Sequence, residues 1–148
     1  MESTLRLTRG ELAALRGEVL AALPWRPQLV TVPEVSHGVA VQTPFWRVGG
    51  AGWPVELSVH RLEGGRLLVS DEGDGGLWLP SGTAREDRWA AVARAAAGWG
   101  VRSNYDHLFA VVPDDWPLDE ALTRVAAASW SLAPQLPEDA APGKDLPR

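Results

Sequence analysis

The stretch VELSVHRLEGGRLLVS, residues 55–70, decides the fold class of this chain. Apolar residues stand at every second position over residues 55–59, which is the period of a strand with one buried face. Gly64 and Gly65 follow, and glycine tolerates the positive φ angles that a tight hairpin demands. The next strand, residues 67–70, is therefore predicted to pair antiparallel with the first.

The same period of two continues on the N-terminal side of this hairpin. Val39, Val41 and Thr43 alternate with Ala40 and Gln42, which predicts a further strand. Pro33, Pro44 and Pro54 divide residues 29–76 into segments too short for helices. We therefore expect a meander of three strands with one covered face and one face exposed to solvent.

A helix is predicted before the sheet, and its start is well marked. Thr8 and Glu11 have the spacing of a capping box, in which each side chain bonds the other residue's backbone amide. The helix should therefore begin near Arg9. Pro24 is expected to end it, because proline lacks the amide that a helix interior needs.

A second helix and a second hairpin are predicted after the sheet. Thr83 and Glu86 repeat the capping-box spacing, and Gly100 is placed to stop the helix. Residues 101–103 and 108–112 then have the composition of two short strands on either side of a turn. These two strands should also pair antiparallel.

The last predicted element is a helix after Pro117, which suits a first helical turn because no amide is needed there. Pro134 closes this helix. The order α-β-β-β-α-β-β-α describes an α+β fold in which helices cover one side of an antiparallel sheet. One domain is expected over residues 1–134, and the proline-rich residues 135–148 are expected to form a flexible tail.

Composition excludes several classes of partner and cofactor. The formal net charge is −5, and the basic residues are nearly all arginines, since Lys144 is the only lysine. These arginines are scattered among acidic residues, so no cationic face for nucleic acid is expected. The chain has no cysteine, which excludes disulfides and thiolate metal sites. No apolar run approaches the ~18 residues of a membrane span, and residues 1–9 contain no signal-peptide core. We therefore expect a cytoplasmic protein that binds neither nucleic acid nor membrane.

Several short motifs follow one another in a defined order: Thr43-Pro44-Phe45, Leu68-Val69-Ser70-Asp71-Glu72-Gly73, Leu79, Ser81-Gly82, Arg88 and Gly100-Val101. Over about residues 35 to 132 they resemble the domain of unknown function numbered eighteen-twenty-eight, which occurs in bacterial and phage genomes. The glycine-rich residues 49–52 and 73–76 and the tryptophans depart from that pattern. The element order is also similar to the type III secretion chaperone-like fold and its YbjN relatives.

These relatives are, as a class, non-enzymatic dimers that hold partner proteins. The resemblance therefore implies a homodimer that binds a protein partner. The occurrence of the resembling family in phage genomes implies an alternative, a mobile-element factor that inhibits a host defence protein.

Asp71, Glu72 and Asp74 lie in a glycine-rich loop between a predicted strand and a predicted helix. Convergent carboxylates can hold Mg²⁺ or Ca²⁺, and the chain would then be a metal-dependent enzyme or a nuclease-like factor. The loop lacks the ligand spacing of a calcium hand and the nearby lysine that metal-dependent nucleases use. The alternative is a solvated turn in which Asp71 bonds local backbone amides. We favour the turn and expect no bound metal or cofactor.

Histidine and serine residues form no recognisable catalytic pattern. The spacing of His37, His60 and His107 supplies no catalytic constellation, and we interpret them as surface residues. Ser70 precedes Asp71 but lacks the Gly-x-Ser-x-Gly elbow that exposes a nucleophile. We therefore predict that the chain is not an enzyme.

Eight tryptophans in 148 residues are the most unusual feature of the composition. An indole ring buries a large area but keeps an N–H to satisfy, which favours half-buried sites and interfaces. Trp46, Trp53 and Trp78 lie in or beside glycine- and proline-rich loops, and we predict that they bind a protein partner. Together with these tryptophans, the resemblance to the secretion chaperone-like fold implies a chaperone-like or adaptor domain. Three further tryptophans, on predicted apolar helix faces, are expected in the core: Trp89, Trp99 and Trp130.

Overall fold

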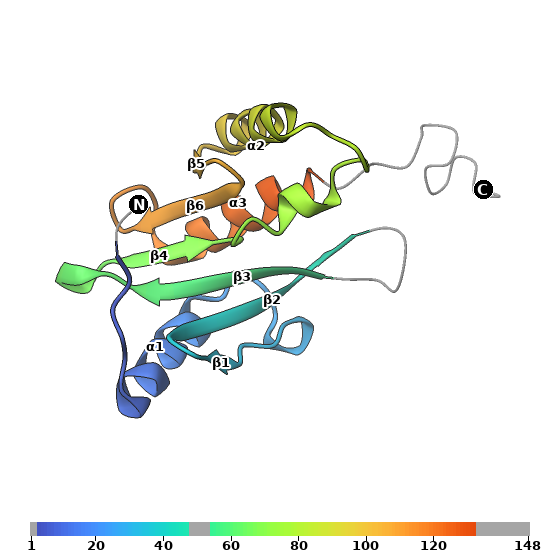
Figure 1. Cartoon of the computed structure of the whole chain (residues 1–148). Coiled ribbons are helices and arrows are strands. Elements are labelled where there is room, and N and C mark those ends of the chain that lie inside the picture. Colours follow the sequence, from blue (N-terminus) through green and yellow to red (C-terminus); the bar gives the residue numbers. More distant parts are fainter. Residues whose placement is uncertain (1–2, 48–53, 133–148) are drawn as a thin grey trace.

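The computed structural model describes residues 3–47 and 54–132 (Figure 1). Trp53 and the predicted tail, residues 135–148, lie outside the described residues. The described chain is an α+β fold with three α-helices and a six-stranded antiparallel open sheet. The elements are α1 (Arg9–Ala22), β1 (Glu34–Val35), β2 (Gly38–Trp46), β3 (Pro54–Arg61), β4 (Leu67–Ser70), α2 (Arg85–Trp99), β5 (Arg102–Asn104), β6 (His107–Val112) and α3 (Leu118–Trp130), with short 3-10 turns at Pro27–Leu29, Glu63–Gly65 and Gly75–Trp78.

The sheet has the strand order β1-β2-β3-β4-β6-β5. The predicted hairpin is confirmed, because β3 and β4 pair antiparallel with His60 opposite Leu68. Gly64 and Gly65 take φ angles of 76° and 78° in the turn between them. The second hairpin is confirmed as well, with β5 antiparallel to β6. Since β6 pairs with β4, the two hairpins form one continuous sheet.

The element order, α-β-β-β-β-α-β-β-α, contains one strand more than predicted. The additional strand is β1, whose two residues pair with Gly38 and Val39 of β2. Both residues of β1 are exposed, so no alternation of buried and solvated positions marks them in the sequence. An isolated bridge between Thr31 and Gln42 continues the same edge of the sheet.

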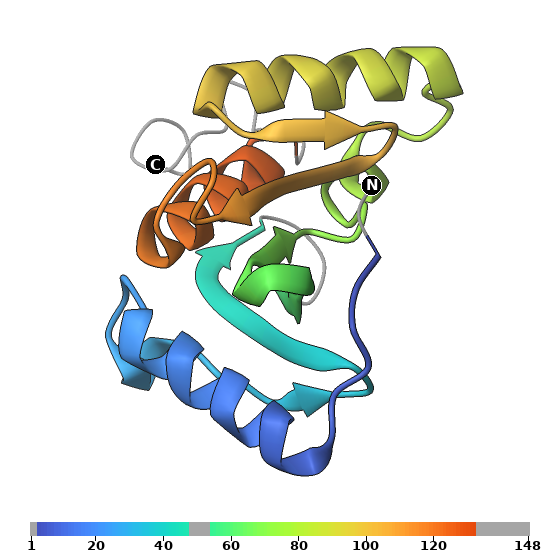
Figure 2. The ribbon, with the colours of Figure 1, turned by 90° about the vertical axis from the view of Figure 1, so that its left-hand side faces the viewer.

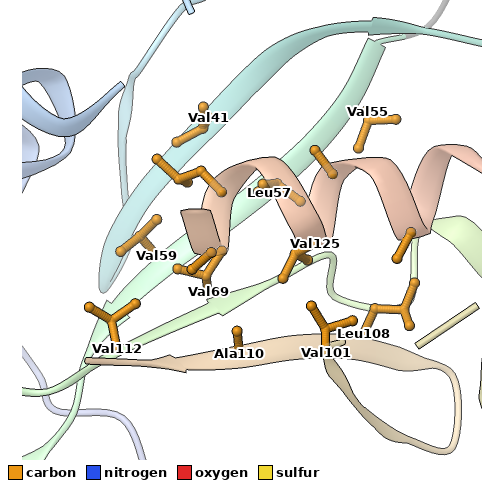
Figure 3. Packing of buried hydrophobic residues seen from close by; sticks show 14 of the residues in the cluster. Val41, Val55, Leu57, Val59, Val69, Val101, Leu108, Ala110, Val112 and Val125 are labelled. Carbon is orange, nitrogen blue, oxygen red and sulfur yellow. The ribbon is translucent and has the colours of Figure 1, made fainter. Parts of the chain in front are cut away.

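All three helices contribute buried residues to one core that they share with a single face of the sheet (Figure 2). On the sheet side this core consists of the alternating apolar residues of β2, β3, β4 and β6, such as Val41, Leu57 and Val69 (Figure 3). Val125 of α3 lies against them (Figure 3). Most buried residues of α3 are small, which lets this helix lie close to the strands without leaving voids.

One of the two predicted capping boxes is present. At α1, the amide of Glu11 donates to Thr8 Oγ1 over 3.2 Å, and the amide of Thr8 donates to the Glu11 carboxylate. The capping box predicted at Thr83 is wrong, because α2 begins one residue later with Ala84 as its N-cap. The Thr83 hydroxyl instead donates to the carbonyl of Pro80, so the preceding turn competes with the helix for this side chain.

The three tryptophans expected in the core differ in burial. Trp130 is half-buried and lies against Phe45, with ring centroids 6.3 Å apart. Trp89 is half-buried against Tyr105, with centroids 4.7 Å apart. The prediction for Trp99 is wrong, since this residue is 40% exposed. The helix that carries it, α2, packs on α3 and on the edge strand β5, so little of its apolar stripe is covered.

The face of the sheet opposite the helices, which we call the helix-free face, is less solvated than predicted. No α-helix of the described chain shares the core on this side, yet four apolar residues form a second buried cluster. The N-terminal segment runs along this side (Figure 2), and its Leu5 amide donates to the carbonyl of Arg61 over 2.9 Å. The cluster consists of Leu62, Leu68, Phe109 and Val111.

Candidate binding groove on the helix-free face

A groove crosses the helix-free face and is made of four hollows that share lining residues. The first hollow, of about 280 Å³, shares Gln42 and Pro54 with the second, of about 230 Å³. The second shares Glu56 and Asp74 with the third, of about 310 Å³. The third shares Glu72 with the fourth, of about 500 Å³. We call this row of adjoining hollows the sheet groove.

Strand alternation points a row of side chains into the sheet groove. The odd-numbered residues 55, 57 and 59 of β3 belong to the core, so Glu56, Ser58 and His60 face the other way. Ala40 and Gln42 occupy the same face on β2, where Ala40 pairs with Ser58 and Gln42 with Glu56. The positions that the sequence assigned to a solvated face are therefore the floor of the groove.

Large apolar side chains are exposed along the groove. Trp46 and Leu29 are 56% and 58% exposed and line the first hollow together. The carbonyl of Trp46 accepts a hydrogen bond from Nε1 of Trp130 over 3.1 Å, which ties this end of β2 to α3. Leu77, which is 80% exposed, and Val35 line the third hollow. Trp46 thus presents its indole at one end of the groove from the last residue of β2.

The other two tryptophans predicted to bind a partner are placed differently. Trp78 is half-buried, and the guanidinium carbon of Arg47 lies 5.1 Å from its ring centroid. Arg47 is itself buried and donates to Ser129 Oγ over 3.0 Å, so Trp78 belongs to an internal contact. Trp53 lies outside the described residues. A partner-binding role stays a prediction for these tryptophans and for Trp46.

Asp71, the first carboxylate of the acidic loop, is buried and accepts four hydrogen bonds from its own chain. Its Oδ1 accepts from the amides of Gly73 and Leu108 at 3.0 and 2.9 Å. Its Oδ2 accepts from the amide of Gly75 at 3.0 Å and from the Ser129 hydroxyl at 2.9 Å. These bonds occupy the acceptor sites of a carboxylate. Asp71 therefore organises a turn as predicted, but the turn is buried and is also bound to β6 and α3.

The other two carboxylates of the loop turn to separate partners. Asp74 Oδ2 lies 2.8 Å from Nη1 of Arg47. Burial raises the pKa of Asp74, although Arg47 opposes the rise. Glu72 accepts from the Ser58 hydroxyl over 2.6 Å. The structure therefore does not gather the three carboxylates around one point, and the described part of the chain contains no group of three His, Cys, Asp or Glu side chains placed to hold a metal.

An uncommon backbone conformation aims Glu72 at the groove. Its φ is 55°, in the left-handed region that residues other than glycine rarely adopt, and its amide donates to Ser70 Oγ over 2.9 Å. His60 Nε2 lies 3.4 Å from the Glu72 carboxylate. The hydrogen bond with His60 lowers the pKa of Glu72 to about 2. The same hydrogen bond raises the pKa of His60, although burial opposes this rise.

The sequence did not reveal this cluster. The prediction that His60 is a surface residue is wrong, because its side chain is only 16% exposed. Strand alternation does place Ser58 and His60 on one face, whereas nothing local marks the positive φ of Glu72. The Ser58 hydroxyl donates to Glu72 instead of to an imidazole, and a carboxylate with so low a pKa is a weak base. The cluster therefore offers binding groups and does not resemble an activated nucleophile.

No family model, no curated protein and no solved structure matches this chain. The resemblance to the domain of unknown function numbered eighteen-twenty-eight stays a prediction that rests on the motifs quoted above. Within residues 3–47 and 54–132, no helix is both long enough and apolar enough to cross a lipid bilayer. The cytoplasmic location also stays a prediction.

Proposed function

We propose that this chain is a non-enzymatic protein-binding domain that holds a segment of a partner protein in the sheet groove. The observation that carries the proposal is the joint exposure of Trp46 and Leu29 at one end of a groove that no described α-helix covers. Exposed aromatic and aliphatic side chains beside a depression are typical anchors of protein interfaces.

Trp46 has enough exposed surface to contribute strongly to binding. A fully covered indole side chain buries roughly 150–250 Å², and 56% of Trp46 is exposed. Covering that part removes on the order of 100 Å² from water, which is worth about 2.5 kcal/mol at about 25 cal/mol per Å². Removing the indole should therefore weaken binding by roughly 50-fold.

The partner segment is expected to lie on the face of the sheet and not along its edges. Pairing with an edge strand requires a row of free backbone groups. At one edge β1 has two residues, and Pro44 of the neighbouring β2 has no N–H to donate. At the other edge β5 has three residues. Both edges offer few backbone hydrogen bonds, whereas the groove offers apolar anchors.

The proposal includes a chaperone-like or adaptor role and a homodimer, as the similarity to the type III secretion chaperone-like fold and its YbjN relatives implies. The succession of helix, sheet, helix, hairpin and helix supports this similarity. Static light scattering tests the dimer separately. A measured mass of two chains would support the dimer. A measured mass of one chain would exclude the dimer but leave the proposal of binding in the groove unchanged. The alternative that the partner is a host defence protein concerns only the identity of the partner.

Partner capture by groove variants tests the proposal. Wild-type protein and the variants Trp46→Ala, Leu29→Ala and Trp99→Ala are immobilised and exposed to lysate of the source cells. We expect proteins retained by the wild type to be lost by the first two variants. Trp99→Ala is the matched control, because it removes an exposed indole from α2, which packs on the opposite face of the sheet from the groove. Retention of the same proteins by Trp46→Ala, or capture of none by the wild type, would contradict the proposal.

A further inference from the structure

The sheet groove carries negative charge that the chain does not neutralise. Its described lining includes four carboxylates and two histidines but neither arginine nor lysine: Glu56, Asp71, Glu72, Asp74, His60 and His107. Asp71 is buried, and its oxygens accept four hydrogen bonds from its own chain. Glu72 and Asp74 each have a basic partner within the chain. Glu56 is exposed and forms no ion pair with any described residue; the amide of Gln42 donates to it over 3.1 Å. Glu56 is therefore the groove carboxylate that is open to an external cation.

The neighbouring Asp74 is affected by this excess of negative charge. Burial raises the pKa of Asp74, and the carboxylates of Asp71 and Glu56 add to the rise. Nearby like charges disfavour an ionised carboxylate, so a cation placed beside Glu56 would relieve the repulsion.

Glu56 lies between the two apolar parts of the groove. It lines the second hollow, which adjoins the hollow of Trp46 and Leu29. It also lines the third hollow, to which Leu77 and Val35 contribute. A chain that crosses the groove would therefore meet an apolar surface, then an unpaired carboxylate, then a second apolar surface.

We infer that the partner segment is an extended peptide with an arginine or lysine that pairs with Glu56, between large apolar side chains that contact Trp46 and Leu77. This inference rests on the proposed function and adds the chemistry of the partner. A second copy of this chain suits the groove less well, because its 14 basic residues are outnumbered by 19 acidic ones and its net charge is −5. Charge complementarity of this kind selects partners and is weakened by salt.

A random peptide library panned against the immobilised wild-type protein tests the inference. Enriched peptides should share a basic residue flanked on both sides by aromatic or large aliphatic residues. In fluorescence anisotropy with one enriched peptide, Glu56→Gln should weaken binding roughly tenfold, and added salt should reduce that difference. Glu86→Gln, on α2, is the matched control and should bind like the wild type. Glu56→Lys, used in a second selection, should enrich acidic peptides in place of basic ones.

The outcomes separate this inference from the proposed function. Peptides that require Trp46 but lack a basic residue, and that bind Glu56→Gln as tightly as the wild type, overturn the inference and leave groove binding in place. Enriched peptides that match segments of this chain also overturn it, in favour of a second copy. If no enriched peptide loses binding with Trp46→Ala, the proposed function itself fails. Circular dichroism of each variant confirms that the fold is retained.

Discussion

Replacing Asp71 with asparagine should destabilise the fold, because the two oxygens of this buried carboxylate accept hydrogen bonds that the amide cannot reproduce. The asparagine oxygen can keep the amides of Gly73 and Leu108, which now bond Oδ1. The new NH₂ group would then face the amide of Gly75 and the hydroxyl of Ser129. A hydroxyl can rotate and accept a hydrogen bond, but the Gly75 amide can only donate and would be left without a partner.

The size of this effect follows from the lost contacts. A buried amide without an acceptor costs roughly 1–3 kcal/mol, and hydrogen bonds to a charged acceptor are stronger than those to a neutral one by about 1 kcal/mol. We therefore expect Asp71→Asn to lower the free energy of unfolding by about 3 kcal/mol, out of a total of roughly 5–15 kcal/mol for a domain.

Urea unfolding of the wild type, Asp71→Asn and the exposed control Asp87→Asn measures this difference. The control should change stability by less than about 0.5 kcal/mol. A loss below about 1 kcal/mol for Asp71→Asn would refute the reasoning. A gain in stability, together with stabilisation of the wild type by Mg²⁺ or Ca²⁺, would favour the metal-site alternative, because removing one of several clustered carboxylates relieves their repulsion.

Two further predictions concern the same loop and its contact with β3. Gly75→Ala should lower the free energy of unfolding in urea by roughly 1–3 kcal/mol, since its Cβ would lie 2.7 Å from the hydroxyl oxygen of Ser129. Gly17→Ala, in α1 where a Cβ meets nothing within 4 Å, should instead raise it by about 1 kcal/mol. The pKa of His60 is raised from 6.5 in the folded state, so its contact with Glu72 stabilises the fold fully below pH 6.5. This stabilisation is lost as the pH rises through the pKa that His60 has in the folded protein. The pKa of Glu72, lowered from 4.5 to about 2, means that the same contact is lost as the pH falls from 4.5 towards 2. The difference in unfolding free energy between the wild type and His60→Gln should therefore be largest between pH 4.5 and 6.5, and a difference that is constant with pH would contradict this pairing.

The features that the sequence predicted correctly depend on residues close together in the chain. The capping box of Thr8 and Glu11 spans one helical turn, and the hairpin of Gly64 and Gly65 is determined by the φ angles of two adjacent residues. Gly100 ends α2 with a φ of 70° for the same local reason. Each of these signals acts before the chain makes any tertiary contact, so each can be read from a short window.

The wrong predictions share the opposite property, because tertiary context decided them. Thr83 has the spacing of a cap, but its hydroxyl bonds the turn at Pro80. Trp99 continues the apolar stripe of α2, but its burial depends on whether another element covers that end of the helix. The strand β1 depends on pairing with β2, since its two residues carry no pattern of their own.

The acidic loop shows most clearly why the site was only partly predictable. Asp71 and Asp74 are three residues apart among the same glycines, yet one accepts four internal hydrogen bonds and the other pairs with Arg47. Their partners come from strands and a helix that are distant in the sequence, such as Ser129. No local pattern could therefore assign the two carboxylates to different roles. The exposure of Trp46 was easier to predict, because a large ring beside glycine- and proline-rich segments has few local neighbours, whereas its role in binding a partner stays a prediction.

A polar residue can bind a ligand only with the hydrogen-bonding capacity and charge that its own chain leaves unsatisfied. By this criterion Asp71, in the loop that resembles a site most closely in the sequence, is a structural residue, because its own chain supplies four donors to it. Glu56 occupies a polar position in an ordinary alternating strand, so the sequence does not mark it as a binding residue. In the structure, however, no described cation neutralises it. The exposed indole of Trp46 is the apolar counterpart of that carboxylate. Because the two residues line adjoining hollows of one groove, a ligand that satisfies both must be a chain with basic and apolar side chains and not a single ion.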